Sequence, residues 1–306
     1  MYVHRWGADV AVCASAKLNL FFEVLGKRND GFHEVETLMV PIGLYDTLLL
    51  RPTADEQIEV DCRWASAPSS GVDPALGDLP RAADNIVTRA LQFVRQEAGL
   101  QAGAKVWLVK RIPSAAGLGG GSSDAAAALL AASTAWNLNW SLARLSLLAA
   151  RLGSDVPFFL PDRQGRLAAA VCRGRGEQIE PIANLGPLHF VVVRPPVGLS
   201  TQAVYAACRP GRPVRTVAPL IAALRSGNWR GVRSGLYNRL EEAADGLSEW
   251  VGRLRNHFAT LDCVASQMSG SGSSYFGVCR NARHARRVAA QLQALDLGRV
   301  FVAMSC

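Results

Sequence analysis

Apolar positions along the chain recur with two spacings, every second residue in some stretches and every third or fourth residue in others. The first spacing is typical of β-strands and the second of amphipathic helices. Strands are therefore predicted over residues 10–24, 35–44, 105–110, 190–194 and 299–303, and on each side of a glycine turn within 264–278. Residues 46–52 and 57–62 alternate in the same way and are predicted to pair as a hairpin.

The helical spacing predicts a second set of elements, which alternates with strands in the C-terminal half. Helices are expected over residues 85–98, 125–135, 141–152, 216–245, 246–258 and 281–295, with one more after 197–205. Asp84 is expected to cap the first helix and Gly99 to end it. Residues 26–33 predict a turn, and residues 63–83, rich in Pro, Gly, Ser and Ala, predict a surface loop.

The segment 112–136, IPSAAGLGGGSSDAAAALLAASTAW, stands out from the rest of the chain. Its four clustered glycines allow positive φ angles and close approach by another group. Ser122, Ser123 and Asp124 favour a helix start, and the alanine-rich run after them favours a helix. A glycine-rich loop that enters a helix presents free N–H groups and a partial positive charge, so phosphate is its natural ligand.

This loop does not match the common nucleotide-binding motifs. No Gly-Lys-Ser/Thr follows it, as a P-loop would require. Counted from Gly117, the third glycine of a dinucleotide fingerprint would be Ser122. The chain contains neither the His-Arg-Asp nor the Asp-Phe-Gly sequence of protein kinases. A purely structural turn remains the alternative for this segment taken by itself.

Composition narrows the class of protein without deciding its chemistry. Of the 306 residues, 49% are hydrophobic, which suits a packed core and is too many for a disordered chain. No apolar run approaches the ~20 residues of a membrane span. Asp9 also interrupts the stretch that a signal peptide would need. The sequence therefore predicts a cytoplasmic protein without a membrane partner.

Cysteines and histidines are dispersed, and neither set predicts a metal site. The seven cysteines form no Cys-x-x-Cys pair and the five histidines show no ligand spacing, so reduced thiols are expected. The net charge is +8, but the arginines are spread out without interleaved aromatic residues, which argues against nucleic-acid binding. A positive field of this kind favours anionic small-molecule substrates.

Residues 113–123 closely resemble the phosphate-binding motif of the GHMP kinases, a family that phosphorylates small molecules. The triple glycine followed by Ser-Ser-Asp-Ala-Ala is similar to one branch of that family, the diphosphocytidyl-methylerythritol kinases. The resemblance implies that ATP phosphates are held by Pro113, Ser114, Ala115, Ala116, Gly117, Leu118, Gly119, Gly120, Gly121, Ser122 and Ser123.

The string AKLNLFFEVLGKRNDGFHEVETLM, residues 16–39, resembles the N-terminal motif of the same branch. There the lysine is catalytic and an aromatic-histidine pair holds cytosine, which by motif match are Lys17, Phe32 and His33. Residues 153–158, GSDVPF, resemble the motif of the catalytic base, here Asp155. Judged alone, Lys17 is equally an exposed strand residue, and a helix cap is the alternative for Asp155.

The remaining site residues follow from weaker similarities. Residues 264–278 resemble the third GHMP motif, in which Gly270 and Gly272 would lie near the substrate. Asn19 is assigned to substrate binding, Asn85 resembles an element near the nucleotide base, and Lys110 is a candidate for the nucleotide phosphates or else an edge-strand lysine. Tyr205 is either the second wall of a cytosine site or a core tyrosine. The glycine-rich turn at 173–177 is assigned no catalytic role.

The resemblance implies an α+β protein with the two-domain GHMP kinase fold. Residues 1–166 would form a domain related to one in ribosomal protein S5, and residues 167–306 a ferredoxin-like domain. The implied reaction is ATP-dependent phosphorylation of the 2-hydroxyl of 4-diphosphocytidyl-2-C-methyl-D-erythritol in non-mevalonate isoprenoid synthesis. Lys17 would assist Asp155, and Mg²⁺ would accompany ATP with Ser123 as its ligand. A monomer or weak homodimer is expected.

Two alternatives remain from the sequence. One is a GHMP kinase for another alcohol, such as homoserine, mevalonate or a sugar, and the pair Phe32-His33 argues against it because those acceptors have no base to stack. The other is a non-catalytic relative that only binds a ligand. Retention of both Lys17 and Asp155 argues against that alternative.

Overall fold

Two long antiparallel strands organise the computed structural model, which describes residues 1–65, 73–162, 165–211 and 213–306. They are β2 (Asp9–Lys27) and β3 (His33–Thr53), joined by the predicted turn. Each is longer than the strand predicted there. The pairing changes register at three places, which explains why the apolar alternation is imperfect: Ser15/Ala16, Asn19/Phe21 and Val24/Gly26.

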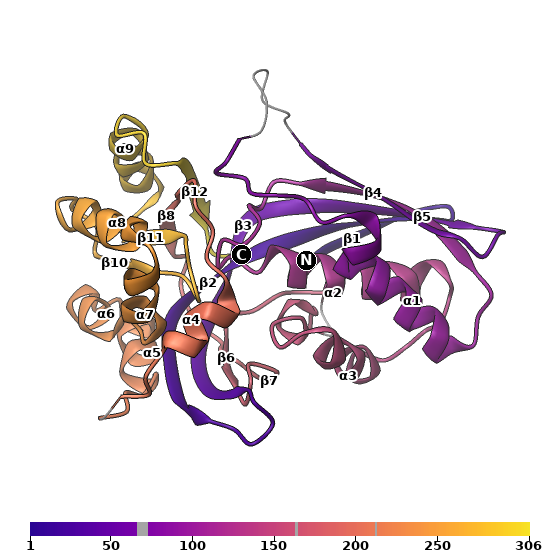
Figure 1. The fold of residues 1–306 in the computed structure, drawn as a ribbon, viewed down its shortest axis with the longest axis horizontal. Coiled ribbons are helices and arrows are strands. Elements are labelled where there is room, and N and C mark those ends of the chain that lie inside the picture. The colour runs from indigo at the N-terminus through magenta and orange to yellow at the C-terminus, as the bar shows by residue number, and fades with distance from the viewer. Residues whose placement is uncertain (66–72, 163–164, 212) are drawn as a thin grey trace.

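These two strands belong to an eight-stranded sheet with the order β1-β2-β3-β5-β4, to which β6, β7 and β9 are added at the side (Figure 1). The other strands of this sheet are β1 (Tyr2–Trp6), β4 (Ile58–Trp64), β5 (Gly103–Lys110), β6 (Ala170–Arg173), β7 (Gln178–Pro181) and β9 (Tyr237–Asn238). β6 pairs with β3, and β9 pairs with β2. Segments beyond residue 167 thus complete a sheet built mainly from the N-terminal half, and a domain boundary at 166 stays a prediction.

The predicted hairpin between residues 46–52 and 57–62 is wrong. β5 lies between β3 and β4, antiparallel to the first and parallel to the second. Parallel neighbours need a crossover in place of a tight turn, and α1 (Ile86–Ala98) lies in the connection from β4 to β5. Lys110 at the end of β5 is therefore not an edge-strand lysine.

Three helices cover one face of this sheet: α1, α2 (Gly120–Ala135) and α3 (Leu142–Leu152) (Figure 1). Gly99 ends α1 at a φ of 63°, as predicted. The cap of α1 is Asn85, whose side chain accepts from the Val87 N–H at 3.0 Å. The predicted cap, Asp84, is one residue too early because it belongs to the short 3₁₀ turn η1 (Ala82–Asp84).

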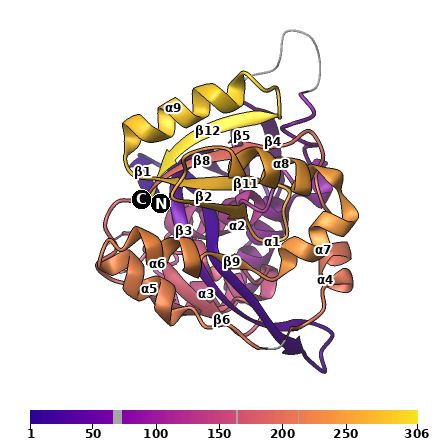
Figure 2. The same cartoon turned by 90° about the vertical axis from the view of Figure 1, so that its left-hand side faces the viewer.

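A second, four-stranded sheet has the order β10-β11-β8-β12. Figure 2 shows β11, β8 and β12 side by side in this sheet. Its antiparallel strands are β8 (His189–Arg194), β10 (Ala265–Met268), β11 (Tyr275–Cys279) and β12 (Arg299–Met304). The helices of this half are α4 (Thr201–Ala207), α5 (Ala218–Arg225), α6 (Trp229–Gly235), α7 (Leu240–Leu247), α8 (Glu249–Ala259) and α9 (Ala282–Gln293). The predicted helical stretch 216–245 is thus three helices, because Asn228 caps a new helix at Trp229 and β9 interrupts the chain after α6.

The second sheet packs on both faces, as the alternation of β8 requires. Val191 and Val193 enter a core with α4, α7, α8 and α9, whereas Phe190 and Val192 enter a core shared with β2 and β3. This shared core joins the two sheets directly. Among the described residues, no helix has the length and apolar character needed to cross a membrane.

The predicted surface loop 63–83 is only partly described, since residues 66–72 lie outside the described residues. Two residues of its later part are not on the surface. Ala75 and Leu76 are buried, and the Leu76 carbonyl oxygen accepts a hydrogen bond from the Ser114 N–H at 2.8 Å. This part of the loop therefore supports the glycine-rich segment.

A buried ion pair ties β2 to the C-terminal helices. The Glu23 side chain is fully buried, and its carboxylate accepts from the Arg239 guanidinium at 2.7 and 3.0 Å. It also accepts from the backbone N–H of Arg215 at 3.0 Å. A carboxylate held in this way is stable in the interior only while its charged partner remains.

Replacing Arg239 with methionine should lower the free energy of unfolding by about 3 kcal/mol, because the Glu23 charge is left buried and unpaired. Urea denaturation at neutral pH measures this change. Arg280→Met is a matched control, since Arg280 meets Asp262 at 3.8 Å with both side chains about half exposed. The control should change the stability by less than ~0.5 kcal/mol. Equal losses in the two variants would contradict the assignment.

Candidate active site

A cavity of about 1000 Å³ opens between the two sheets. Its walls come from segments far apart in the sequence: β2, the turn before β3, the glycine-rich loop, residues 154–155, the β6–β7 turn, α4 and the loop 270–272. Every residue from Pro113 to Ser122 lines it, and their contact with ATP phosphates stays a prediction. Ser123 is the one member of the predicted loop that does not line the cavity.

The glycines of this loop are required by their surroundings. Gly117 has a φ of 70°, and a Cβ there would collide with the Ser269 carbonyl oxygen. Gly119 has a φ of 72°, and a Cβ there would lie 2.8 Å from the Phe159 ring, which belongs to the 3₁₀ turn η2 (Pro157–Phe159). Only a residue without a side chain fits both positions.

α2 begins at Gly120 with Gly119 as its N-cap, earlier than the alanine run predicted. Ser122, Ser123 and Asp124 therefore lie inside the helix and not before it. With no side chain capping this end, free N–H groups of the first turn and the positive end of the helix dipole are available at the cavity. This arrangement can bind phosphate.

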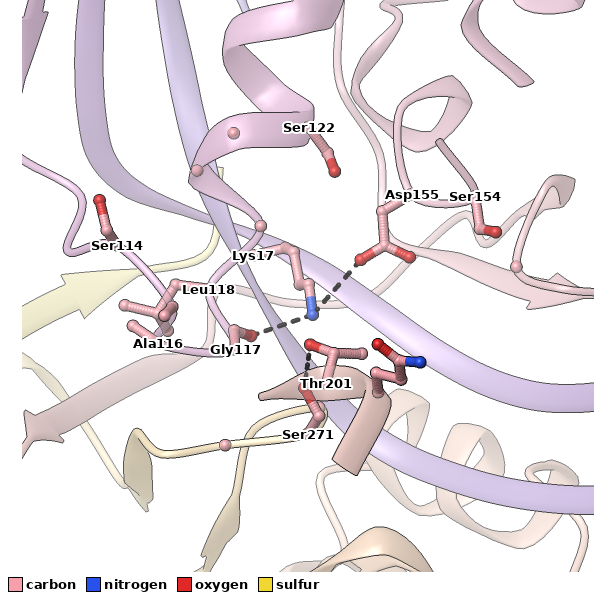
Figure 3. A pocket seen from close by; sticks show the side chains of 18 of the residues that line it. Lys17, Ser114, Ala116, Gly117, Leu118, Ser122, Ser154, Asp155, Thr201 and Ser271 are labelled. Carbon is pink, nitrogen blue, oxygen red and sulfur yellow. Dashed lines mark hydrogen bonds and ion pairs between the residues drawn. The ribbon is translucent and has the colours of Figure 1, made fainter. Parts of the chain in front are cut away.

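The predicted magnesium ligand, Ser123, does not line the cavity. Successive residues of a helix are rotated by about 100°, and this rotation turns Ser123 toward the core. Ser122 lines the cavity (Figure 3), whereas Ser123 is fully buried and its hydroxyl has no hydrogen-bond partner among the described residues. No group of three or more His, Cys, Asp or Glu in the described part of the chain is placed to hold a metal ion.

Lys17 is buried at the centre of the site, so the alternative of an exposed strand residue is wrong. Its ammonium donates to the Gly117 carbonyl oxygen at 3.0 Å and lies 3.7 Å from the Asp155 carboxylate (Figure 3). Burial lowers the pKa of Lys17, and the nearby Asp155 charge opposes that shift. The Asp155 side chain is 33% exposed and lines the cavity.

Asn19 does not line the cavity, although the sequence assigned it to the substrate. Its side-chain oxygen accepts from the Lys17 ammonium at 2.5 Å, and its amide nitrogen donates to the Thr37 hydroxyl at 2.8 Å. Thr37 in turn donates to the Phe21 carbonyl oxygen at 2.6 Å. Asn19 therefore orients Lys17. Sequence reasoning missed Thr37, because only the pairing of β2 with β3 brings it there.

The loop 269–272 completes the wall beside Lys17. Gly270 has a φ of 55°, and a Cβ there would lie 3.2 Å from the Lys17 ammonium nitrogen. The Asn238 amide donates to the carbonyl oxygens of Met268 and Gly270 at 2.9 and 2.8 Å. The Glu241 carboxylate accepts from the Met268 N–H at 3.1 Å. Asn238 and Glu241 thus hold this loop in place.

The other end of the cavity is aromatic. Phe32 is 48% exposed there, and His33 stacks on Tyr205 with ring centroids 5.1 Å apart and an angle of 30°. Tyr205 also meets Phe22 edge-on at 6.4 Å, so it lines the cavity and packs against the core at once. Burial lowers the pKa of His33, with a smaller contribution from Lys27, so its imidazole is neutral at pH 7.

Two family models match this chain: the GHMP kinases N terminal domain over residues 85–162 and the GHMP kinases C terminal over residues 220–295. A relative from Pelotomaculum thermopropionicum, named 4-diphosphocytidyl-2-C-methyl-D-erythritol kinase, is 40% identical over 289 residues. The alignment covers 94% of this chain and 95% of the relative. The chain belongs to the 4-diphosphocytidyl-2-C-methyl-D-erythritol kinase family. A second relative of the same name, from a Synechococcus species, is 38% identical and covers 94% of each chain.

Solved structures agree with this family. A crystal structure of 4-(cytidine 5'-diphospho)-2C-methyl-D-erythritol kinase matches with a TM-score of 0.78 at 34% identity, over 97% of this chain and 99% of that one. Homoserine kinase from Cytophaga hutchinsonii covers 100% of this chain and 97% of its own, with a TM-score of 0.69 at 16% identity, which shows the fold alone. The predicted α+β GHMP kinase fold is confirmed.

In this kinase, Lys110 lies under the start of α2. Its ammonium pairs with the Asp46 carboxylate and, at 2.5 Å, with the Asp124 carboxylate, and all three side chains are buried. Burial acts to lower the pKa of Lys110, but the two carboxylates outweigh it and raise that pKa. Lys110 and Asn85 both line the cavity. Contact of either residue with ATP stays a prediction, and the charge of Lys110 is already compensated.

Asp124 should make the stability of the kinase depend on pH. Burial raises its pKa to about 8, against the opposing pull of Lys110. In the unfolded chain the pKa is about 3.9. Between these values the folded state binds a proton that the unfolded state does not. The protonated Asp124 side chain therefore stabilises the folded state fully below the lower pKa, and this contribution is lost as the pH rises to the upper pKa.

We therefore expect the free energy of unfolding to fall between pH 5 and 8, with an Asp124 contribution on the order of 1 kcal/mol per pH unit. Asp124→Asn should flatten this dependence, as measured by urea denaturation at four pH values. Asp61→Asn is the control, because Asp61 is an exposed carboxylate on β4. Identical slopes for the native protein and Asp124→Asn would show that Asp124 does not hold this proton.

Proposed function

We propose that the chain transfers the γ-phosphoryl group of ATP to the 2-hydroxyl of 4-diphosphocytidyl-2-C-methyl-D-erythritol. The observation that carries this proposal is the position of Lys17 and Asp155 in one cavity, with the glycine-rich loop on one side and Phe32 and His33 on the other. Relatives that bear this kinase name are 32–40% identical to it. We expect the enzyme to act in the cytoplasm as a monomer or weak homodimer.

The glycine-rich loop holds the phosphates of ATP. Its glycines let the backbone approach closely, and the start of α2 supplies N–H donors and a partial positive charge. Asn85, at the far wall, is the candidate for contact with the base. Mg²⁺, when bound with ATP, neutralises charge on the β- and γ-phosphates. Ser122, whose hydroxyl lies at the cavity, is the loop side chain placed to approach it.

Asp155 accepts the proton of the attacking hydroxyl. In the transfer, a bond forms between the acceptor oxygen and the γ-phosphorus, the bond to ADP breaks, and the hydroxyl proton passes to the Asp155 carboxylate. A carboxylate is a weak base, which suffices when the transition state is loose and proton transfer is late. The partly exposed side chain can then return the proton to solvent.

Lys17 stabilises charge at the reacting centre. Its ammonium lies 3.7 Å from the Asp155 carboxylate, beside the point where the acceptor hydroxyl would lose its proton. Asn19 and the Gly117 carbonyl oxygen take two of its three N–H donors and fix its direction. The third donor is directed toward Asp155 and the space beside it, where the acceptor oxygen and the γ-phosphate would meet.

The aromatic end of the cavity, which we call the acceptor end, suits a pyrimidine base. Phe32 offers a flat exposed face for stacking, and it lacks the hydroxyl of the tyrosine more usual in the family. A neutral His33 carries one N–H donor and one nitrogen acceptor, which matches the mixed donor and acceptor edge of cytosine. Homoserine and mevalonate have no ring to use these groups.

ADP release by the purified protein tests the function. With Mg-ATP, turnover is expected with 4-diphosphocytidyl-2-C-methyl-D-erythritol and not with homoserine, mevalonate or galactose. Turnover with one of the other alcohols alone would keep the phosphate loop and reject the cytosine end. ATP binding without turnover of any acceptor would reject catalysis.

Asp155→Asn should lower kcat by about a hundredfold or more, the usual contribution of a positioned general base. Binding of ATP should be unchanged, because the glycine-rich loop is untouched. Steady-state kinetics and ATP titration measure the two effects. Asp84→Asn is the control, since Asp84 is exposed and outside the cavity. Near-normal kcat in Asp155→Asn would remove Asp155 as the base.

A further inference from the structure

Arg175 lies over a ring that the acceptor would use. Its guanidinium carbon is 4.6 Å from the centroid of the Phe32 ring, a cation–π distance. The side chain lines the cavity and is 27% exposed. Sequence reasoning gave its turn no role, and the reaction described above does not use it.

The turn that carries Arg175 is bonded to β3 at one end and lies beside Asp155 at the other. The Gly174 carbonyl oxygen accepts from the Val35 N–H at 2.8 Å, two residues after His33. On the other side of Arg175, a Cβ on Gly176 would lie only 3.5 Å from an Asp155 carboxylate oxygen. The turn therefore spans the distance between the aromatic end of the cavity and the proposed base.

Two cationic side chains line this part of the cavity, Lys27 and Arg175. Lys27 is opposite His33 in the pairing of β2 with β3. The neighbouring carboxylates of Asp30, Glu34 and Glu177 do not line the cavity. Apart from Asp155, this part of the cavity therefore presents positive charge inward.

Most donors of Arg175 are available to a ligand. Besides Phe32, its side chain has two weak polar contacts within the described part of the chain, with the Glu177 carboxylate at 3.9 Å and the Ala150 carbonyl oxygen at 3.5 Å. Arg28, by comparison, is committed to Asp30 and Glu34 at 3.1 and 2.7 Å. A guanidinium offers five N–H donors in a planar fork that matches two phosphate oxygens.

We propose that Arg175 and Lys27 form a binding site for the diphosphate of the acceptor. The proposal rests on the proposed function, since in that substrate the diphosphate separates the cytidine from the reacting hydroxyl. Arg175 lies between the groups assigned to those two ends, Phe32 and Asp155. Its fork binds phosphate oxygens in a fixed direction, and Lys27 adds a point charge. The site would select nucleoside diphosphates over the nucleoside.

The test compares two probes that share the base, cytidine 5'-diphosphate and cytidine. Calorimetric titration of the native protein, Arg175→Ala and Lys27→Ala gives the affinity for each. We expect the diphosphate affinity to fall about tenfold or more in Arg175→Ala, as for loss of a charge-assisted hydrogen bond. The cytidine affinity should stay within about twofold. Arg28→Ala is the control, because Arg28 lies in the same turn region but outside the cavity.

Three results would overturn the proposal. One is an unchanged diphosphate affinity in both variants. Another is an equal loss of cytidine and diphosphate affinity, which would mean that Arg175 only supports Phe32. The third is the same loss in Arg28→Ala, which would indicate a general charge effect. Arg175→Lys tests whether the loss in Arg175→Ala comes from misfolding. It keeps the positive charge but lacks the planar guanidinium, so it should recover part of the diphosphate affinity.

Turnover separates this proposal from the proposed function. If the native protein phosphorylates the acceptor, Arg175→Ala should raise KM for the acceptor about tenfold while kcat and KM for ATP stay near native values. Unchanged KM with normal turnover would reject the diphosphate site and leave the function intact. If the native protein has no turnover, an Arg175-dependent preference for the diphosphate over cytidine would still support the site.

Discussion

The burial of one ammonium group determines how the rest of this structure is arranged. Lys17 comes from β2, yet its charge is satisfied by Asn19 on the same strand, by a carbonyl oxygen of the glycine-rich loop and by Asp155 from the segment after α3. A lysine without these partners would be too costly to bury. Two glycines lie close against this lysine: a Cβ on Gly119 would come 3.0 Å from the Lys17 Cγ, and a Cβ on Gly270 would come 3.2 Å from its Nζ.

Much of the site was predictable because the same physical demands leave short, dense sequence patterns. Close backbone approach requires glycine, so the phosphate loop and the loop at 270–272 were visible as glycine clusters, and both line the cavity. Lys17 and Asp155 were identified through motifs, not through any spacing between them. Most of the helices were predictable from their apolar periodicity, and Ser141, Asn281 and Gly99 define helix ends as such residues should.

What the sequence could not supply was pairing across long separations. β5 enters between β3 and β4, and β6, β7 and β9 join a sheet begun some 150 or more residues earlier, because apolar alternation specifies which face is buried and not which strand is adjacent. The positions of Asn19 and Ser123 were not predictable for a related reason. Both lie in the expected motif, but the direction of a single side chain depends on strand register or helix rotation, and neither side chain lines the cavity.

The long strands β2 and β3 have one more consequence. Within the larger sheet they stay paired, through three register shifts, from the region of Lys17 to the turn beside Phe32, and the shared core holds the second sheet against them. The separation between Lys17 and the aromatic end of the cavity is therefore set by this pair of strands. The fold thus selects its acceptor by length. An alcohol joined to its base by a shorter or longer linker would place its hydroxyl out of reach of the nucleotide, even if both of its ends were bound.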